Sequence, residues 1–236
     1  MKPETLKKID KAYDKFYELH YWLHEIENNY HNADQFRWLH NVFINTYQIT
    51  LNQVGHALKD TSYKEKYTKI KEEHWSKDNL FKRTTDKRNT IVHEEDLKLN
   101  SSAFLCLISN KKGCDKFRLP ISNNNSKDSD LLIIQTLKKK DYPFYETFMN
   151  NEDYDLAVYR EWKINQNDCI LKENRELLLI MSNFIHDVFI LTGHCINKEN
   201  PFRLDCCPPI NSIKYQIYDR NELIKNLFNP KLPEIC

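Results

Sequence analysis

The chain has 236 residues, a net charge of +1 with histidine neutral, and only three glycines. A chain of this length is typical of one core domain with an added part. Tight β-turns and phosphate-cradling loops both need glycine, so the composition disfavours an all-β fold and a P-loop enzyme. The balanced charge does not mark a basic nucleic-acid binder, so an anionic partner would have to meet a local patch.

No apolar run approaches the roughly 18 residues that suggest a membrane span. The N-terminal stretch is charged throughout, unlike a secretory signal. The seven cysteines are odd in number and scattered, as expected for reduced thiols. We therefore expect a cytoplasmic protein with no membrane partner.

Apolar residues recur at three- and four-residue steps through the first 58 residues, and they predict two long antiparallel helices joined by a short turn. Asn32 with Gln35 is the expected capping pair between them, and Ser62 with Glu65 precedes a short third helix. Asp78 is the expected cap of a fourth helix. The residues that share one face of that helix are Leu80, Thr84, Arg88 and Val92.

The pattern changes after Leu99. The β-like runs 101–109 and 116–122 predict a hairpin. Residues 131–140 and 145–163 predict two further helices.

The clearest helix of the second half spans 171–192. It is apolar over much of its circumference, which is typical of a central helix in a bundle, and Gly193 is a suitable stop. Farther on, 212–218 predicts an edge strand, and Asp219 is the expected cap of a last short helix.

These elements predict a mainly α fold with three parts. Residues 1–97 plus 171–194 form a helical bundle. Residues 98–170 form an α+β insertion in it. Residues 195–236 form a short mixed C-terminal extension.

Three residues of the fourth helix, Arg88, Asn89 and His93, suit metal-independent RNA cleavage. Asn89 and His93 lie one helical turn apart, and the long side chain of Arg88 reaches toward them. Histidine serves as a general acid or base near neutral pH, and arginine matches phosphate oxygens with a permanent charge. One helix supplies one histidine, so a complete acid–base pair requires a symmetric homodimer.

The pattern R-N-x-x-x-H at 88–93 resembles the signature of the HEPN superfamily (higher eukaryotes and prokaryotes nucleotide-binding domains). Two long helices before the motif and an apolar last helix agree with that family, over roughly half of the chain. The resemblance implies a HEPN-like helical bundle, a homodimer with facing motifs, and a metal-independent endoribonuclease that cleaves RNA as a toxin or defence effector. It also implies an antitoxin or sensor protein as partner.

Carried over residue by residue, the resemblance makes His93 the general acid or base. Arg88 would bind the scissile phosphate, and Asn89 would orient both groups. A HEPN subset paired with a nucleotidyltransferase antitoxin has a modified tyrosine two residues after the histidine. Here that position is Glu95, so control by modification at this site is not expected.

Two other hypotheses stay open. One is a non-catalytic HEPN-like scaffold that binds RNA, a nucleotide or a protein partner. The other is a chance match on a solvated helix face. Lys82, Arg83 and Lys87 precede the motif and either guide the RNA backbone or form an ordinary surface cluster.

Two sets of residues have metal-ligand character. His20 and His24 share a helix face at a spacing that suits a metal, but no Glu-x-x-His pattern accompanies them. The second set comprises His194, Cys195, Cys206 and Cys207. Adjacent cysteines are awkward ligands for one tetrahedral ion, and no C-x-x-C pair occurs. We therefore expect half-buried histidines and small buried thiols, with no metal and no cofactor.

Overall fold

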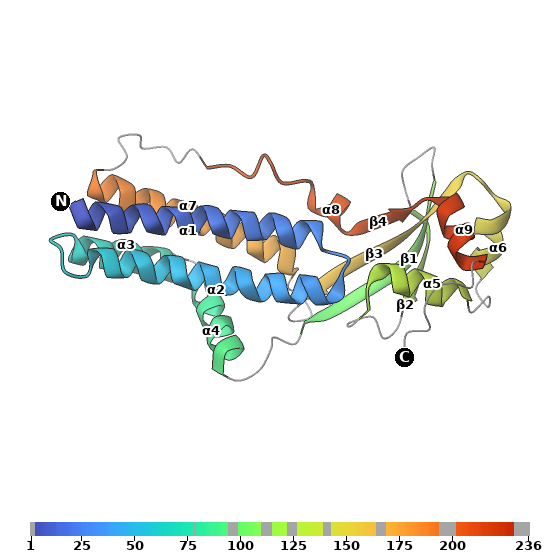
Figure 1. The fold of residues 1–236 in the computed structure, drawn as a ribbon, viewed down its shortest axis with the longest axis horizontal. Helices are drawn as coiled ribbons and strands as arrows, with labels where there is room; N and C mark the ends of the chain where they lie inside the picture. The colour runs from blue at the N-terminus through green and yellow to red at the C-terminus, as the bar shows by residue number, and fades with distance from the viewer. Residues whose placement is uncertain are drawn as a thin grey trace. The chain divides into compact units, whose positions relative to one another are not determined.

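The computed structural model describes residues 3–77, 79–93, 99–109, 115–121, 127–138, 143–163, 169–193 and 202–228. Within these residues the chain is mainly helical and has one four-stranded antiparallel sheet, an α+β arrangement (Figure 1). The chain divides into two compact units. The first comprises residues 1–28, 37–98 and 168–208, and the second comprises 29–36, 99–167 and 209–236.

The first unit is a helical bundle. Its elements are α1 (Pro3–Asn28), most of α2 (Ala33–Leu58), α3 (Lys64–Lys77), α4 (Asn79–His93) and α7 (Ile170–Thr192). The two long helices, the short third helix and the helix that carries the motif are therefore confirmed. α7 contacts α1, α3 and α4, which makes it the central helix of the unit.

The apolar stripe of α1 is buried at three- and four-residue steps, as the hydrophobic period requires. The buried residues of this stripe are Ile9, Ala12, Phe16, Leu19, Leu23 and Ile26. α7 is buried around most of its circumference and ends where predicted. Gly193 has a φ of 76°, in the left-handed region, and its N–H reaches the carbonyls of Phe189 and Ile190.

Three of the predicted caps are described. The Asn32 side chain accepts the Gln35 N–H at 2.9 Å, and the Asp219 side chain accepts the Glu222 N–H at 2.8 Å, so both are confirmed as caps. Before α3 the hydroxyl of Thr61, not that of the predicted Ser62, accepts a backbone N–H: Thr61 Oγ1 accepts the Tyr63 N–H at 3.2 Å. The predicted cap at position 78 lies outside the described residues.

The second unit contains the sheet, in the order β2-β1-β3-β4 with every pair antiparallel. Its strands are β1 (Asn100–Ser109), β2 (Asp115–Ile121), β3 (Tyr154–Lys163) and β4 (Tyr215–Tyr218). The hairpin and the edge strand are confirmed. The predicted insertion and the predicted extension thus contribute strands to one sheet.

Short helices accompany the sheet: α5 (Ser129–Lys138), α6 (Pro143–Asn150), α8 (Ile210–Ile213) and α9 (Arg220–Phe228). A shared core joins α5, α6 and α9 to one face of β1 and β3. Its buried residues include Leu105, Leu107, Ile133, Phe148 and Val158.

The helix predicted over 145–163 is wrong for its second half. Residues 145–150 are helical, but Tyr154–Lys163 is strand β3, between β1 and β4. Leu156, Ala157 and Val158 are all fully buried. A strand buried on both faces has no alternation of apolar and polar residues, so periodicity alone does not separate it from a helix.

Candidate functional site

The motif helix α4 is fixed to the bundle along one face. Leu80 and Thr84 are buried, and the Thr84 hydroxyl donates to the Leu80 carbonyl at 2.8 Å. One turn farther, Lys87 Nζ donates to Glu173 Oε2 on α7 at 2.8 Å. The Arg83 guanidinium lies 3.5 Å from the other oxygen of Glu173. An apolar contact and an ion pair therefore set which face of α4 points inward.

The first two residues of the motif, Arg88 and Asn89, are accessible at the protein surface. Arg88 is half-buried and Asn89 is exposed, with the Arg88 guanidinium 3.3 Å from Asn89 Oδ1. His93 is the last residue of α4, one turn after Asn89, and its side chain lies outside those described. In an ideal helix residue 89 lies about 180° around the axis from the buried Leu80, and residue 93 about 40° beyond it. The backbone thus places positions 89 and 93 on the outward side of α4.

The three cations expected to guide RNA lie in two environments. Lys82 is exposed, and its helical position is close to that of Asn89. Arg83 and Lys87 both contact Glu173. Of the three, Lys82 has the outward position that an RNA contact requires, whereas Lys87 holds the helix in place.

A buried polar cluster lies behind α4, and sequence reasoning did not identify it. Glu173 and Asn174 of α7 are buried, and the Asn174 amide is 3.2 Å from Nδ1 of the fully buried His40 on α2. Burial and, second, the nearby charge of Lys87 lower the pKa of His40 to about 3, so this imidazole is neutral. The sequence offered little signal for this cluster, because Glu173 and Asn174 lie in the polar first turns of α7, beside Lys172, Arg175 and Glu176.

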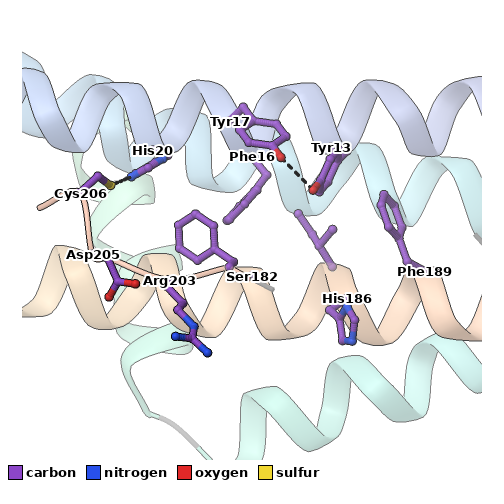
Figure 2. A pocket seen from close by; sticks show the side chains of 12 residues that line it. Tyr13, Phe16, Tyr17, His20, Ser182, His186, Phe189, Arg203, Asp205 and Cys206 are labelled. Atoms are coloured by element: carbon purple, nitrogen blue, oxygen red, sulfur yellow. Dashed lines mark hydrogen bonds between the residues drawn. The ribbon is translucent and has the colours of Figure 1, made fainter. Parts of the chain in front are cut away.

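A second feature of the unit is a pocket of about 510 Å³ between α1, α7 and residues 202–206 (Figure 2). Its volume falls in the range of small-ligand sites. The α1 side contributes Tyr13, Phe16, Tyr17 and His20, and the α7 side contributes Ser182, Ile185, His186 and Phe189. The remaining lining residues are Phe202, Arg203, Asp205 and Cys206.

Aromatic contacts form one wall of this pocket. The Phe202 ring lies 4.9 Å from Phe16 and 5.2 Å from His20, both edge-on. At one end Cys206 points toward His20, and their Sγ and Nε2 atoms are 3.3 Å apart (Figure 2). Because residues 202–206 are nearly 190 positions from α1 in the sequence, helical periodicity did not predict the pocket.

No protein-family model, no curated protein and no solved structure matches this chain. Among the residues that the structure describes, no helix is both long enough and apolar enough to cross a membrane.

Proposed function

We propose that this protein is a metal-independent endoribonuclease of the HEPN type. It acts as a homodimer in the cytoplasm, as a toxin or defence effector held in check by an antitoxin or sensor protein. The observation that carries the proposal is the arrangement of Arg88, Asn89 and His93 on one helix. That helix is anchored through its inner face, and its motif begins at the surface.

The reaction needs a base, an acid and a cation, and the motif has residues of these types. A histidine takes the proton of the ribose 2′-hydroxyl, and the 2′-oxygen attacks the adjacent phosphorus. The bond from phosphorus to the 5′-oxygen breaks, and a second histidine returns a proton to that oxygen. The products are a 2′,3′-cyclic phosphate and a 5′-hydroxyl.

Arg88 binds the scissile phosphate and stabilises the charge that develops on its oxygens. Asn89 orients the reacting groups, as its contact with the Arg88 guanidinium suggests. One chain supplies one His93, so the acid and the base come from two chains related by a two-fold axis.

Surface access supports a catalytic role over a packing role. A site that cleaves RNA must admit the ribose-phosphate backbone, and Asn89 is exposed and Arg88 partly exposed. The exposed Lys82 adds a cation on the same side of α4 for the neighbouring phosphates. A motif arginine with a structural role would instead be paired inside the bundle, as Lys87 is with Glu173.

The test compares the parent protein with Arg88→Ala and His93→Ala on end-labelled single-stranded RNA and on total cellular RNA. We expect a 2′,3′-cyclic phosphate on the upstream product. The His93 substitution should lower the cleavage rate by about 10²–10⁴-fold. The Arg88 substitution should lower it by about 10²–10³-fold.

Two control substitutions remove a histidine and a basic residue elsewhere in the unit. His56→Ala on α2 and Lys69→Ala on α3 change exposed side chains of the same unit and should leave the rate unchanged. Cleavage that survives both motif substitutions would contradict the proposal. A folded dimer that binds these RNAs and does not cleave them would favour the non-catalytic scaffold.

A further inference from the structure

Two residues of α1 and two residues of the 202–208 segment form a cluster of potential metal ligands. His20, His24, Cys206 and Cys207 each offer one nitrogen or sulfur, and these four atoms lie within 4.8 Å of one another. The sequence separates the two pairs by more than 180 positions. Only the folded chain brings them together.

Two of the distances within the cluster are close to the edges of a tetrahedral zinc site. Cys206 Sγ is 3.3 Å from His20 Nε2 and 3.5 Å from His24 Nε2. With bonds of about 2.3 Å to sulfur and about 2.0–2.1 Å to nitrogen, the edges of a zinc tetrahedron are about 3.4–3.8 Å. The two measured edges are within about 0.2 Å of the nitrogen–sulfur edge of that tetrahedron. All four atoms lie within 4.8 Å of one another, so the longest edge would close by up to about 1 Å when an ion binds.

A buried carboxylate lies beside one of the histidines. Glu27 Oε2 lies 3.4 Å from His24 Nδ1, while the opposite ring nitrogen of His24 faces Cys206. The Glu27 side chain is only 2% exposed, and its other oxygen accepts the Arg175 Nε–H at 2.8 Å. Metal-bound histidines usually donate their second N–H to a carboxylate, which fixes the tautomer and the ring orientation. Glu27 has the position of that second partner.

The backbone around the two cysteines is held independently. The Cys207 N–H donates to the Leu204 carbonyl at 2.9 Å, which closes a turn. Arg175 donates to the Pro208 carbonyl while it also pairs with Glu27. The turn presents both sulfurs to the same side of α1. Adjacent cysteines therefore become compatible with one ion here, although their spacing argued against it in the sequence.

We propose that His20, His24, Cys206 and Cys207 bind one Zn²⁺ ion in a closed tetrahedral site. Four protein ligands leave no open position for substrate, so the ion is structural. It fixes residues 202–208 to α1 and holds Phe202 in the wall of the pocket described above. This site departs from the sequence-based expectation of no metal, and it does not depend on the proposed ribonuclease activity.

The first measurement is the zinc content of the full chain, produced without a polyhistidine tag and purified without chelator. Elemental analysis should find about one Zn²⁺ per chain. The substitutions His20→Ala, Cys206→Ser and Cys207→Ser should each lower this to below about a tenth. His56→Ala and Cys169→Ser are the matched controls, and both should retain the ion.

Cobalt substitution tests the ligand set directly, because the spectrum of the parent protein alone reports the coordination geometry and the presence of thiolate ligands. Parent protein freed of zinc and loaded with Co²⁺ should show the intense visible bands of tetrahedral cobalt and a thiolate-to-cobalt charge-transfer band in the near ultraviolet. Cys206→Ser and Cys207→Ser should each weaken the charge-transfer band, and circular dichroism identifies any variant that fails to fold.

Four results would overturn the site. One is folded parent protein that contains no zinc and takes up neither Zn²⁺ nor Co²⁺. Another is an octahedral cobalt spectrum. A third is full metal retention by Cys207→Ser, and the fourth is a disulfide between Cys206 and Cys207 in protein isolated under reducing conditions. None of these would bear on the ribonuclease proposal, whose readout is the cyclic phosphate.

Discussion

Glu173 accepts a hydrogen bond from Lys87, the residue directly before the motif arginine, at 2.8 Å. Both side chains are largely buried, at 12% and 15% exposed. Because a carboxylate inside a helical bundle is costly without a cation, the pair determines both the docking of α4 and the direction of the next residues. The anchor of the proposed active site is thus on α7.

Glu173→Gln should destabilise the first unit, because it leaves Lys87 as a buried charge without its ion partner. We expect a loss of about 1–3 kcal/mol in the free energy of unfolding, measured by urea denaturation. Glu176→Gln on the same helix is the control, because its contact with Lys172 is exposed and should contribute less than about 0.5 kcal/mol. Equal effects of the two substitutions would show that the Lys87 pair does not anchor α4.

Lys82 and Lys87 should have different effects on RNA. Lys82→Ala should weaken binding to single-stranded RNA a few-fold and reduce the slope of log affinity against log salt by about 0.7. Lys87→Ala should instead lower stability, because Lys87 contacts Glu173. Filter binding at several salt concentrations separates the two, with Lys69→Ala as the control. An unchanged slope of log affinity against log salt in Lys82→Ala would show that Lys82 does not contact an RNA phosphate.

His31 should make the second unit sensitive to acid. The imidazole is hydrogen-bonded to Ser129 Oγ at 2.8 Å and to the Ile213 carbonyl at 3.0 Å. A carbonyl only accepts, so Nε2 bears the proton and Nδ1 accepts from the hydroxyl. Burial first, with a smaller contribution from the Arg160 charge, lowers the pKa of His31 from 6.5 to about 4.

Between these two pKa values the unfolded chain binds a proton at His31 and the folded chain does not. The contribution of His31 to stability is therefore complete above about pH 6.5 and is lost as the pH falls toward about 4, by about 2–3 kcal/mol. Denaturation at several pH values should show a shallower decline for His31→Gln than for the parent. Parallel profiles for the two proteins would contradict this assignment.

Glu27→Gln should loosen the proposed zinc site and retain its four ligands. Without the carboxylate, His24 loses the partner that orients its ring, and zinc affinity should fall by about 10–100-fold in a competition with a chromogenic chelator. Asp187→Asn removes a carboxylate that lies 2.8 Å from another histidine of the same unit, His74, and is the control. Unchanged affinity in Glu27→Gln would show that the carboxylate does not support the site.

The helices of the first unit were predictable because helix formation depends on residues that are close together in the sequence. Apolar residues at three- and four-residue steps define α1 and α2, and short polar residues at their ends satisfy backbone N–H groups, as Asn32 does. Strand β3 was not predictable in the same way. Its middle residues are buried on both faces, and its partners β1 and β4 lie about 55 positions before and after it.

The candidate sites differ in the same way, because some of their residues are close in the sequence and others meet only in the folded chain. Arg88, Asn89 and His93 are neighbours in the sequence, so a regular helix brings them to adjacent positions and the motif is readable directly. Glu173 approaches Lys87 across 86 positions, and Cys206 approaches His20 across 186. Such pairs depend on which segments pack together, which a single sequence without tertiary contacts does not specify.

By itself the sequence determined the long helices, the hairpin, the caps at Asn32 and Asp219 and the motif on α4, because backbone hydrogen bonding and helical period act over a few residues. Tertiary structure alone decided that Glu173 anchors the motif helix and that a cysteine pair meets a histidine pair at α1. The physical reason is that packing in the folded chain brings together residues that are far apart in the sequence. A charge or a thiol acquires its chemical role only when packing has chosen its neighbours.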